Sequence, residues 1–199
     1  MRAGRAASRG PLPSSREQPA AAGPHPPGPG PAGVVAVAAV HEREALLTAL
    51  REQREHVLQA VDGLADADLR RPVLPSGWTC LGLVQHLARD VERFWFRAVV
   101  AGEAVELCSG DEAWRVDDTT PARDVLAAYR AECRACDEVI GRTELTAQPA
   151  RWPTDVFADL PVRDLRSTIL AVIVETACHA GHLDAVRELL DGRQHLVLT

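Results

Sequence analysis

Hydrophobic residues recur every three or four positions along four long segments of the chain. In the first segment, for example, Leu46, Leu47 and Leu50 fall on one face of a helix. The four segments cover about residues 40–64, 80–100, 121–141 and 163–190. Strand-like alternation is scarce, and long amphipathic helices joined by long connections are typical of helical bundles. The pattern predicts an all-α protein, a four-helix bundle.

Residues that begin or end helices flank these segments. Thr79 is expected to cap the second helix, and Pro121 stands near the start of the third, where proline is tolerated. The pair Asp191–Gly192 is expected to end the fourth helix. The two long connections, about residues 102–120 and 144–163, are rich in glycine, aspartate or proline and are expected to be irregular.

The first 33 residues differ in composition from the rest of the chain. They hold four arginines against one acidic residue, and proline, glycine and alanine make up much of the remainder. Such a segment cannot bury enough apolar surface to offset its chain entropy. We therefore expect residues 1–33 to be a disordered tail and residues 34–199 to form the bundle domain. Two alternatives are a signal peptide with Val34–Val40 as a short apolar core and a true start near Val34.

The overall charge narrows the classes of partner. The 199 residues carry 22 basic side chains, all of them arginine, and 28 acidic ones, for a formal net charge of −6. An acidic balance argues against a nucleic-acid partner, which needs a concentrated basic face. No run approaches the ~18 apolar residues that span a bilayer. We therefore expect neither a nucleic acid nor a membrane as partner.

The five cysteines have an odd count and irregular spacing, which is not a disulfide framework. Cys133 and Cys136 form a single CxxC pair inside a helical segment. Without a second pair or a nearby histidine, reduced thiols are favoured over zinc binding or redox chemistry. Cys178 is expected to be a small buried residue. This cysteine usage fits a reducing cytoplasm.

The fourth helical segment carries titratable residues on or beside its apolar face. At 100° per residue, Glu175, His179 and His182 fall within about 60° of one another, close to Val172 and Val186. Burying such groups costs several kcal/mol unless they are paired or bound to a metal ion. Their position therefore indicates a functional site inside the bundle.

Glu175 and His179 are one helical turn apart, so both can reach one ion, but a third ligand must come from another helix. His86, at the edge of the apolar stripe of the second helix, is the leading candidate; His41 and His56 are the others, and His56 is expected to be solvated. Two histidines and a carboxylate with open positions suit Zn²⁺, Fe²⁺ or Ni²⁺. The alternative is a set of hydrogen-bonded histidines without a metal.

Further side chains could serve a substrate. His182 is a candidate substrate contact, proton relay or alternative ligand. Arg93 and Arg97 lie at about 20° to either side of His86 and could hold an anionic group near the metal. The alternative for the two arginines is a solvated face paired with acids. The tryptophans are expected to anchor loops and core or to wall the pocket: Trp78, Trp95, Trp114 and Trp152.

Two motifs about ninety residues apart resemble one known family. Ser76–Thr79 (SGWT), Leu83–Leu87 (LVQHL) and Glu92–Phe96 (ERFWF) look like the second helix of the DinB-like superfamily. Glu175–Asp184 (ETACHAGHLD) resembles its metal-binding fourth helix. The resemblance is strongest to the mycothiol transferase branch and covers about residues 41–192.

The resemblance implies a four-helix bundle with one divalent metal ion, usually zinc. The family ligands, carried over, are His86, Glu175 and His179. Many relatives have histidine where this chain has Glu175, and the glutamate is more similar to the mycothiol-dependent maleylpyruvate isomerase branch. Family members commonly form homodimers, so a homodimer is an expectation here.

The expected function is a metal-dependent thiol S-transferase, with mycothiol as co-substrate and a small electrophile as substrate. Metal binding would supply the thiolate, His182 would relay a proton or orient the thiol, and Arg93 and Arg97 would help to hold the co-substrate. Two alternatives remain: a non-catalytic stress or ligand-binding bundle that keeps the metal site for structure, and a metal-dependent hydrolase that uses metal-bound water.

Overall fold

The computed structural model describes residues 31–195, with side chains from Val40 onward. Seven helical elements follow one another in this part of the chain, and it contains no strand. They are α1 (Pro31–Val61), α2 (Asp66–Leu69), α3 (Cys80–His86), η1 (Leu87–Val100), η2 (Glu112–Trp114), α4 (Ala122–Arg142) and α5 (Leu165–Asp191). The π-helix η1 continues α3 without a break, so the two form one rod.

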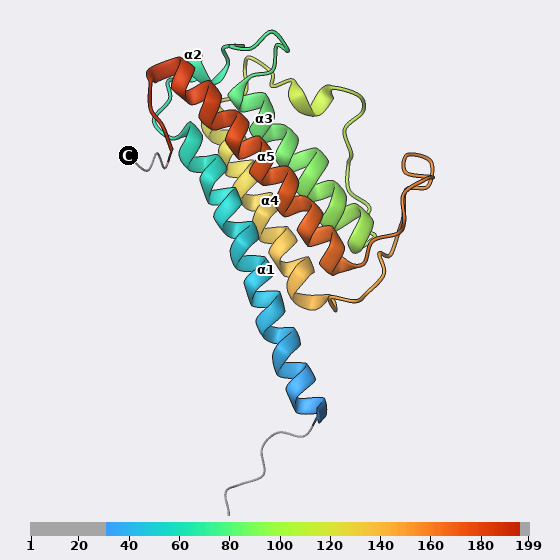
Figure 1. Ribbon diagram of the computed structural model, residues 1–199. Helices are drawn as coiled ribbons and strands as arrows, with labels where there is room; N and C mark the ends of the chain where they lie inside the picture. The colour runs from blue at the N-terminus through green and yellow to red at the C-terminus, as the bar shows by residue number, and fades with distance from the viewer. Residues whose placement is uncertain (1–30, 196–199) are drawn as a thin grey trace, which may run out of the picture.

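Four rods make the body of the molecule: α1, the α3–η1 rod, α4 and α5 (Figure 1). The most extensive packing is between α1 and α5 and between η1 and α4. The rod α3–η1 also lies against α5 (Figure 1). The N-terminal end of α1 projects past the other helices. The predicted all-α four-helix bundle is therefore confirmed.

The ends of the helices follow local chemistry. Thr79 caps α3 as expected, because its hydroxyl accepts a hydrogen bond from the Gly82 N–H at 3.0 Å. Gly192 ends α5 in the left-handed region, with φ of 76°. The first helix begins earlier than the periodicity predicted, at Pro31, because the alanine-rich stretch that follows favours helix. Residues 1–30 of the predicted tail lie outside the described residues, so disorder there stays a prediction.

The core holds one ion pair among its apolar side chains. Large residues such as Leu50, Phe96 and Ile169 are fully buried between the rods. Arg54 of α1 and Glu92 of η1 lie among them at 4% and 1% exposure, joined by two hydrogen bonds of 2.7 and 2.6 Å. Burial opposes the charge of Arg54 and would lower its pKa, but Glu92 and Asp137 together favour the charged form, and the pKa of the guanidinium lies above its usual range.

Helix α5 is the one described helix that is long and apolar enough to cross a membrane by length and composition alone. Core helices of soluble proteins pass the same test. In this bundle Val172, Leu183 and Val186 of α5 are buried among the other rods. The absence of a membrane partner stays a prediction.

Candidate metal centre

Donor residues from two helices that are far apart in sequence meet where α3 lies against α5. His86 is the last residue of α3, and Glu175 and His179 lie one turn apart on α5. One donor atom from each side chain lies within 4.8 Å of the other two. The Nε2 atom of His179 is 3.0 Å from Oε1 of Glu175, and the rings of His86 and His179 meet edge to face at 5.2 Å. The structure thus brings together the residues that the sequence named as metal ligands.

Two contacts fix the ring of His86. Its Nδ1 atom lies 3.0 Å from Oδ2 of Asp90, one turn further along the rod. The indole of Trp114 stacks on the other side, 4.0 Å between centroids and 16° between planes. A carboxylate on one ring nitrogen of a histidine is the usual partner that orients a metal ligand and leaves the other nitrogen for the ion. Asp90 was missed from sequence, although its i+4 spacing from His86 is the signal that points to it.

The short helix η2 carries Trp114 to this position. The side-chain amide of Gln85 on α3 donates to the carbonyl oxygens of Ala113 and Arg115 at 2.9 and 2.8 Å, which ties the segment to the rod. Gly82 permits the close approach, since a Cβ atom there would lie 2.3 Å from the Trp114 carbonyl oxygen. The chain between η1 and α4 therefore wraps over α3 and covers one face of His86.

The ring of His179 is ready to bind a cation. Its side chain is 13% exposed, and its Nδ1 atom is buried with no hydrogen-bond partner among the described residues. Burial lowers the pKa of His179 below its usual value, although Glu175 beside it acts in the opposite direction. The neutral imidazole is the form that coordinates a metal ion. Glu175 is half exposed, so the group opens to solvent on the α5 side.

This donor set fits a divalent metal ion. Two imidazoles and one carboxylate are the ligands of many three-residue metal sites, in which a further position stays open. His86, Glu175 and His179 are therefore the residues that would hold the ion.

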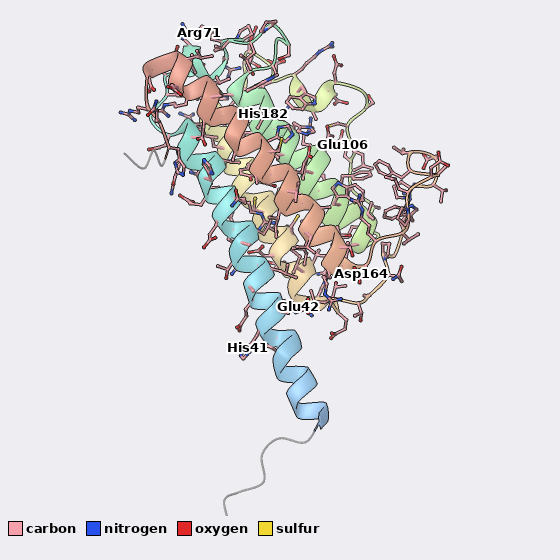
Figure 2. The ribbon with its side chains drawn as sticks, in the orientation of Figure 1. His41, Glu42, Arg71, Glu106, Asp164 and His182 are labelled. Carbon is pink, nitrogen blue, oxygen red and sulfur yellow. The ribbon has the colours of Figure 1, made fainter. Side chains whose placement is uncertain are left out.

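His182 lies one turn beyond the donor group, on the side of α5 that faces α3 (Figure 2). Its exposed ring is 5.5 Å from that of His179 and 6.3 Å from the indole of Trp78. It is a neighbour of the group and no member of it. Cys178, on the same helix, is exposed, so the expectation of a small buried residue is wrong.

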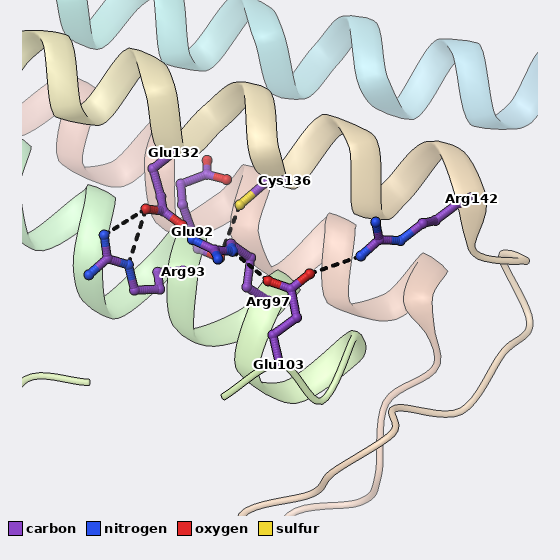
Figure 3. A network of polar contacts seen from close by, with 7 residues as sticks. All are labelled: Glu92, Arg93, Arg97, Glu103, Glu132, Cys136 and Arg142. Carbon is purple, nitrogen blue, oxygen red and sulfur yellow. Dashed lines mark hydrogen bonds and ion pairs between the residues drawn. The ribbon is translucent and has the colours of Figure 1, made fainter. Parts of the chain in front are cut away.

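Arg93 and Arg97 point from η1 toward α4, as Figure 3 shows. Arg93 binds Oε2 of Glu132 through two nitrogens at 2.8 and 3.1 Å, and Arg97 binds Oε1 of the same residue at 3.1 Å. Arg97 also donates to Glu103 at 2.7 Å, and Glu103 in turn accepts from Arg142 at 2.9 Å. Both arginines are paired with acids, which is the alternative weighed from the sequence. Their part in holding a co-substrate stays a prediction.

A cavity of about 690 Å³ lies on this side of the rod. Gln85, Arg89, Arg93 and Glu132 are among its lining residues, with part of the segment that follows η2. None of the three donor residues lines it. The cavity is therefore separate from the donor group, although Gln85, the residue before His86, lines it.

The remaining histidine and cysteine candidates lie elsewhere. His41 is exposed, far down α1 from His182 (Figure 2). His56 is half-buried and hydrogen-bonded to Asp184 on α5, so the expectation of a solvated residue is wrong. Cys133 and Cys136 are free, in agreement with the favoured interpretation of the CxxC pair. Burial raises the pKa of Cys133 to about 12 and that of Cys136 further, so both stay protonated thiols.

Comparison with known proteins adds one finding. A family model described as mycothiol S-transferase matches residues 45–192, a range that includes all three donor residues and most of the bundle. No curated protein and no solved structure matches the chain. The matched range agrees with the extent of the resemblance found from the two motifs. The chain belongs to the mycothiol S-transferase family of the DinB-like superfamily.

Proposed function

We propose that the protein is a metal-dependent transferase that joins the sulfur of mycothiol to a small electrophilic molecule. The observation that carries the proposal is the convergence of His86, Glu175 and His179, whose donor atoms lie within 4.8 Å of one another. Family membership supports the thiol as co-substrate.

Each residue of the group has a defined task. Asp90 and Trp114 orient His86. Asp90 contacts Nδ1 of the ring, which leaves Nε2 for the ion. His179 and Glu175 supply a neutral and an anionic donor from one helix face. A divalent ion held there, zinc before iron or nickel, would lower the pKa of a bound thiol and so provide thiolate at neutral pH.

The chemistry that follows needs a place for one proton. As the sulfur forms its bond to the electrophilic carbon, either a leaving group departs with its electron pair or the adjacent carbon takes a proton. His182, exposed beside His179, would accept the thiol proton and return it. Arg93 lines the neighbouring cavity and would hold an anionic part of the co-substrate there, with Arg97 supporting it through Glu132.

The cysteines bear on the cellular compartment. The five cysteines are free in the structure, which fits a reducing cytoplasm, where such thiols persist. A homodimer remains an expectation drawn from the family.

The decisive experiment compares two histidine variants of the untagged protein. We expect His179→Ala to lose one equivalent of metal, measured by elemental mass spectrometry. The rate of thiol transfer should also fall, by more than the about 10–100-fold expected when only a residue that supports a ligand is removed. His41→Ala, which changes an exposed histidine outside the group, should keep both. Equal metal content in the two variants would overturn the proposal.

A cobalt-substituted sample separates the competing functions. Under the proposal, added thiol changes the visible spectrum, because sulfur enters the open position, and a thiol panel with several electrophiles gives thiol-dependent products. A spectrum that thiol leaves unchanged would point to the non-catalytic binding bundle. Turnover of esters or amides without thiol would point to the hydrolase.

A further inference from the structure

A second group of metal-binding side chains lies where α1 packs against the C-terminal part of α5, and it belongs to no site described so far. It consists of His56 on α1, Asp184 on α5 and His195 in the segment after α5. One donor atom from each lies within 4.8 Å of the other two. Figure 1 shows how this arises, because the chain directly after α5 turns back toward α1.

The contacts within this group leave donors unused. Nε2 of His56 is 2.7 Å from Oδ2 of Asp184, and the imidazole of His195 stacks on that of His56 at 3.9 Å. The other carboxylate oxygen of Asp184, Oδ1, is buried and has no hydrogen-bond partner among the described residues. A plain aspartate–histidine hydrogen bond requires no third side chain, and a buried unpaired oxygen costs about 1–3 kcal/mol. Both features are explained when a cation lies between the three side chains.

Local structure holds His195 in place. The left-handed Gly192 reverses the chain, and the N–H of Arg193 then donates to Asp191 Oδ1 at 3.0 Å. The side-chain amide of Gln194 donates to Glu188 Oε1 at 2.6 Å. The segment is therefore fastened to the last turns of α5, and this fixes the direction in which His195 leaves it.

The charges around the group favour a cation. The nearest buried base, Arg187, is used by Asp191 and by the carbonyl oxygens of Ala60 and Asp62, so it does not neutralise Asp184. A hollow of about 580 Å³ beside the group is lined by His56 and His195 together with Glu52 and Glu55. Arg51, also on this wall, is paired with Asp137 of α4.

We infer that His56, Asp184 and His195 form a second site for a divalent transition-metal ion, zinc by donor chemistry, which fastens the C-terminal segment to α1 and α5. Two imidazoles and one carboxylate at bond lengths of about 2.0–2.2 Å bring their donor atoms about 3–3.5 Å apart. The observed separations run from 2.7 Å up to the 4.8 Å limit, and since an ion binds in the plane of an imidazole ring, the ring of His195 has to turn out of its stack on His56 to reach that geometry. This site does not depend on the proposed transferase function.

Metal counting in a variant that lacks the first site tests the inference. After zinc loading and dialysis, untagged His179→Ala protein should retain about one equivalent. His179→Ala/His195→Ala and His179→Ala/Asp184→Asn should retain none, while the control His179→Ala/His41→Ala keeps one. Asp184→Asn preserves the shape of the side chain, so its loss of zinc is separate from a failure to fold. Equal zinc in His179→Ala and both test variants would overturn the inference. The transferase assay is scored separately in His195→Ala alone, where the first site is intact.

A second readout follows the segment itself. Trypsin cleaves after Arg193, whose side chain is 71% exposed. Zinc should slow this cleavage at least several-fold in the wild-type chain and should have no effect in Asp184→Asn. Cleavage that zinc leaves unchanged in the wild-type chain would show that no ion holds the segment.

Discussion

The orientation of one imidazole depends on a residue that does not belong to the donor group. Asp90 lies at hydrogen-bond distance from Nδ1 of His86, and the ring cannot turn away because Trp114 covers its face. The i, i+4 spacing that brings Glu175 to His179 on α5 is used a second time here, between His86 and Asp90. One helical turn thus supplies each half of the site with its carboxylate.

Asp90→Ala is expected to weaken metal binding without removing a ligand. The free ring of His86 would sample other rotamers, and the loss of such a partner costs about 10–100-fold in affinity. Competition with a chelator measures the effect. Glu138→Ala, an exposed acid on α4, is the matched control and should bind metal as the wild type does. Unchanged affinity in Asp90→Ala would mean that Trp114 alone holds the ring.

The cysteines should differ widely in reactivity. Burial raises the pKa of Cys133 to about 12 and that of Cys136 further, whereas Cys178 is exposed on α5. Near neutral pH, iodoacetamide should therefore label Cys178 in the folded protein and reach Cys133 and Cys136 only after denaturation. Peptide mass mapping gives the order. Rapid labelling of Cys136 in the folded chain, or a Cys133–Cys136 disulfide under mild oxidation, would contradict the thiol interpretation.

At the scale of the helices, the 100° periodicity predicted which residues share a face on the α-helix α5 but failed on the π-helix η1. Glu175 and His179 were placed on one face at 100° per residue, and α5 is α-helical throughout. Arg93 and Arg97 were placed beside His86 by the same rule, but η1 is a π-helix, which rotates less per residue. The lag accumulates over the residues after His86 and turns both arginines toward Glu132 on α4. Nothing in the sequence pattern distinguishes the two kinds of helix.

The close contact between α3 and η2 depends on glycine, which has no side chain, at position 82. Gly82→Ala would set a Cβ 2.3 Å from the Trp114 carbonyl oxygen, a backbone atom, so the segment must move. We expect a loss of about 1–3 kcal/mol in the free energy of unfolding, as for other overpacked sites, and weaker metal binding because Trp114 leaves His86. Gly181→Ala on α5 meets nothing within 4 Å and should stabilise by about 0.5–1 kcal/mol. Urea unfolding and chelator competition measure both variants, and equal effects in the two would contradict the contact.

At the scale of the whole molecule, three of the four rods meet at one buried guanidinium. Arg54 of α1 bonds to Glu92 of η1 and, at 2.6 Å, to Asp137 of α4. Arg54 is 38 positions from Glu92 and 83 positions from Asp137 in the sequence. The pair His56–Asp184 joins residues 128 positions apart. Such pairs follow from the packing of the rods. The sequence predicted the bundle from its periodicity but could not predict which charges meet inside it.

Removing one partner of the buried pair should lower global stability. Glu92→Ala leaves the Arg54 charge buried with only Asp137 to balance it, and such a change costs about 3–5 kcal/mol. The double variant Arg54→Met/Glu92→Leu should recover most of this loss, because neither charge of this pair is then left buried. Equilibrium unfolding in urea measures both. A loss in Glu92→Ala below about 1 kcal/mol, the range of exposed pairs, would contradict the burial of this pair.

The π-helix η1 has a consequence for changes in chain length. A helix with wide turns already holds more residues than an α-helix of the same extent, so it can lose one residue between Leu87 and Val100 by tightening those turns while His86 stays in place. Helix α5 is α-helical throughout and has no wide turns that could tighten in this way. A deletion between Leu165 and Glu175 would rotate both of its donors by about 100° relative to the core stripe. A one-residue deletion should therefore be tolerated after His86 and excluded before Glu175, an asymmetry between the two helices that supply the site.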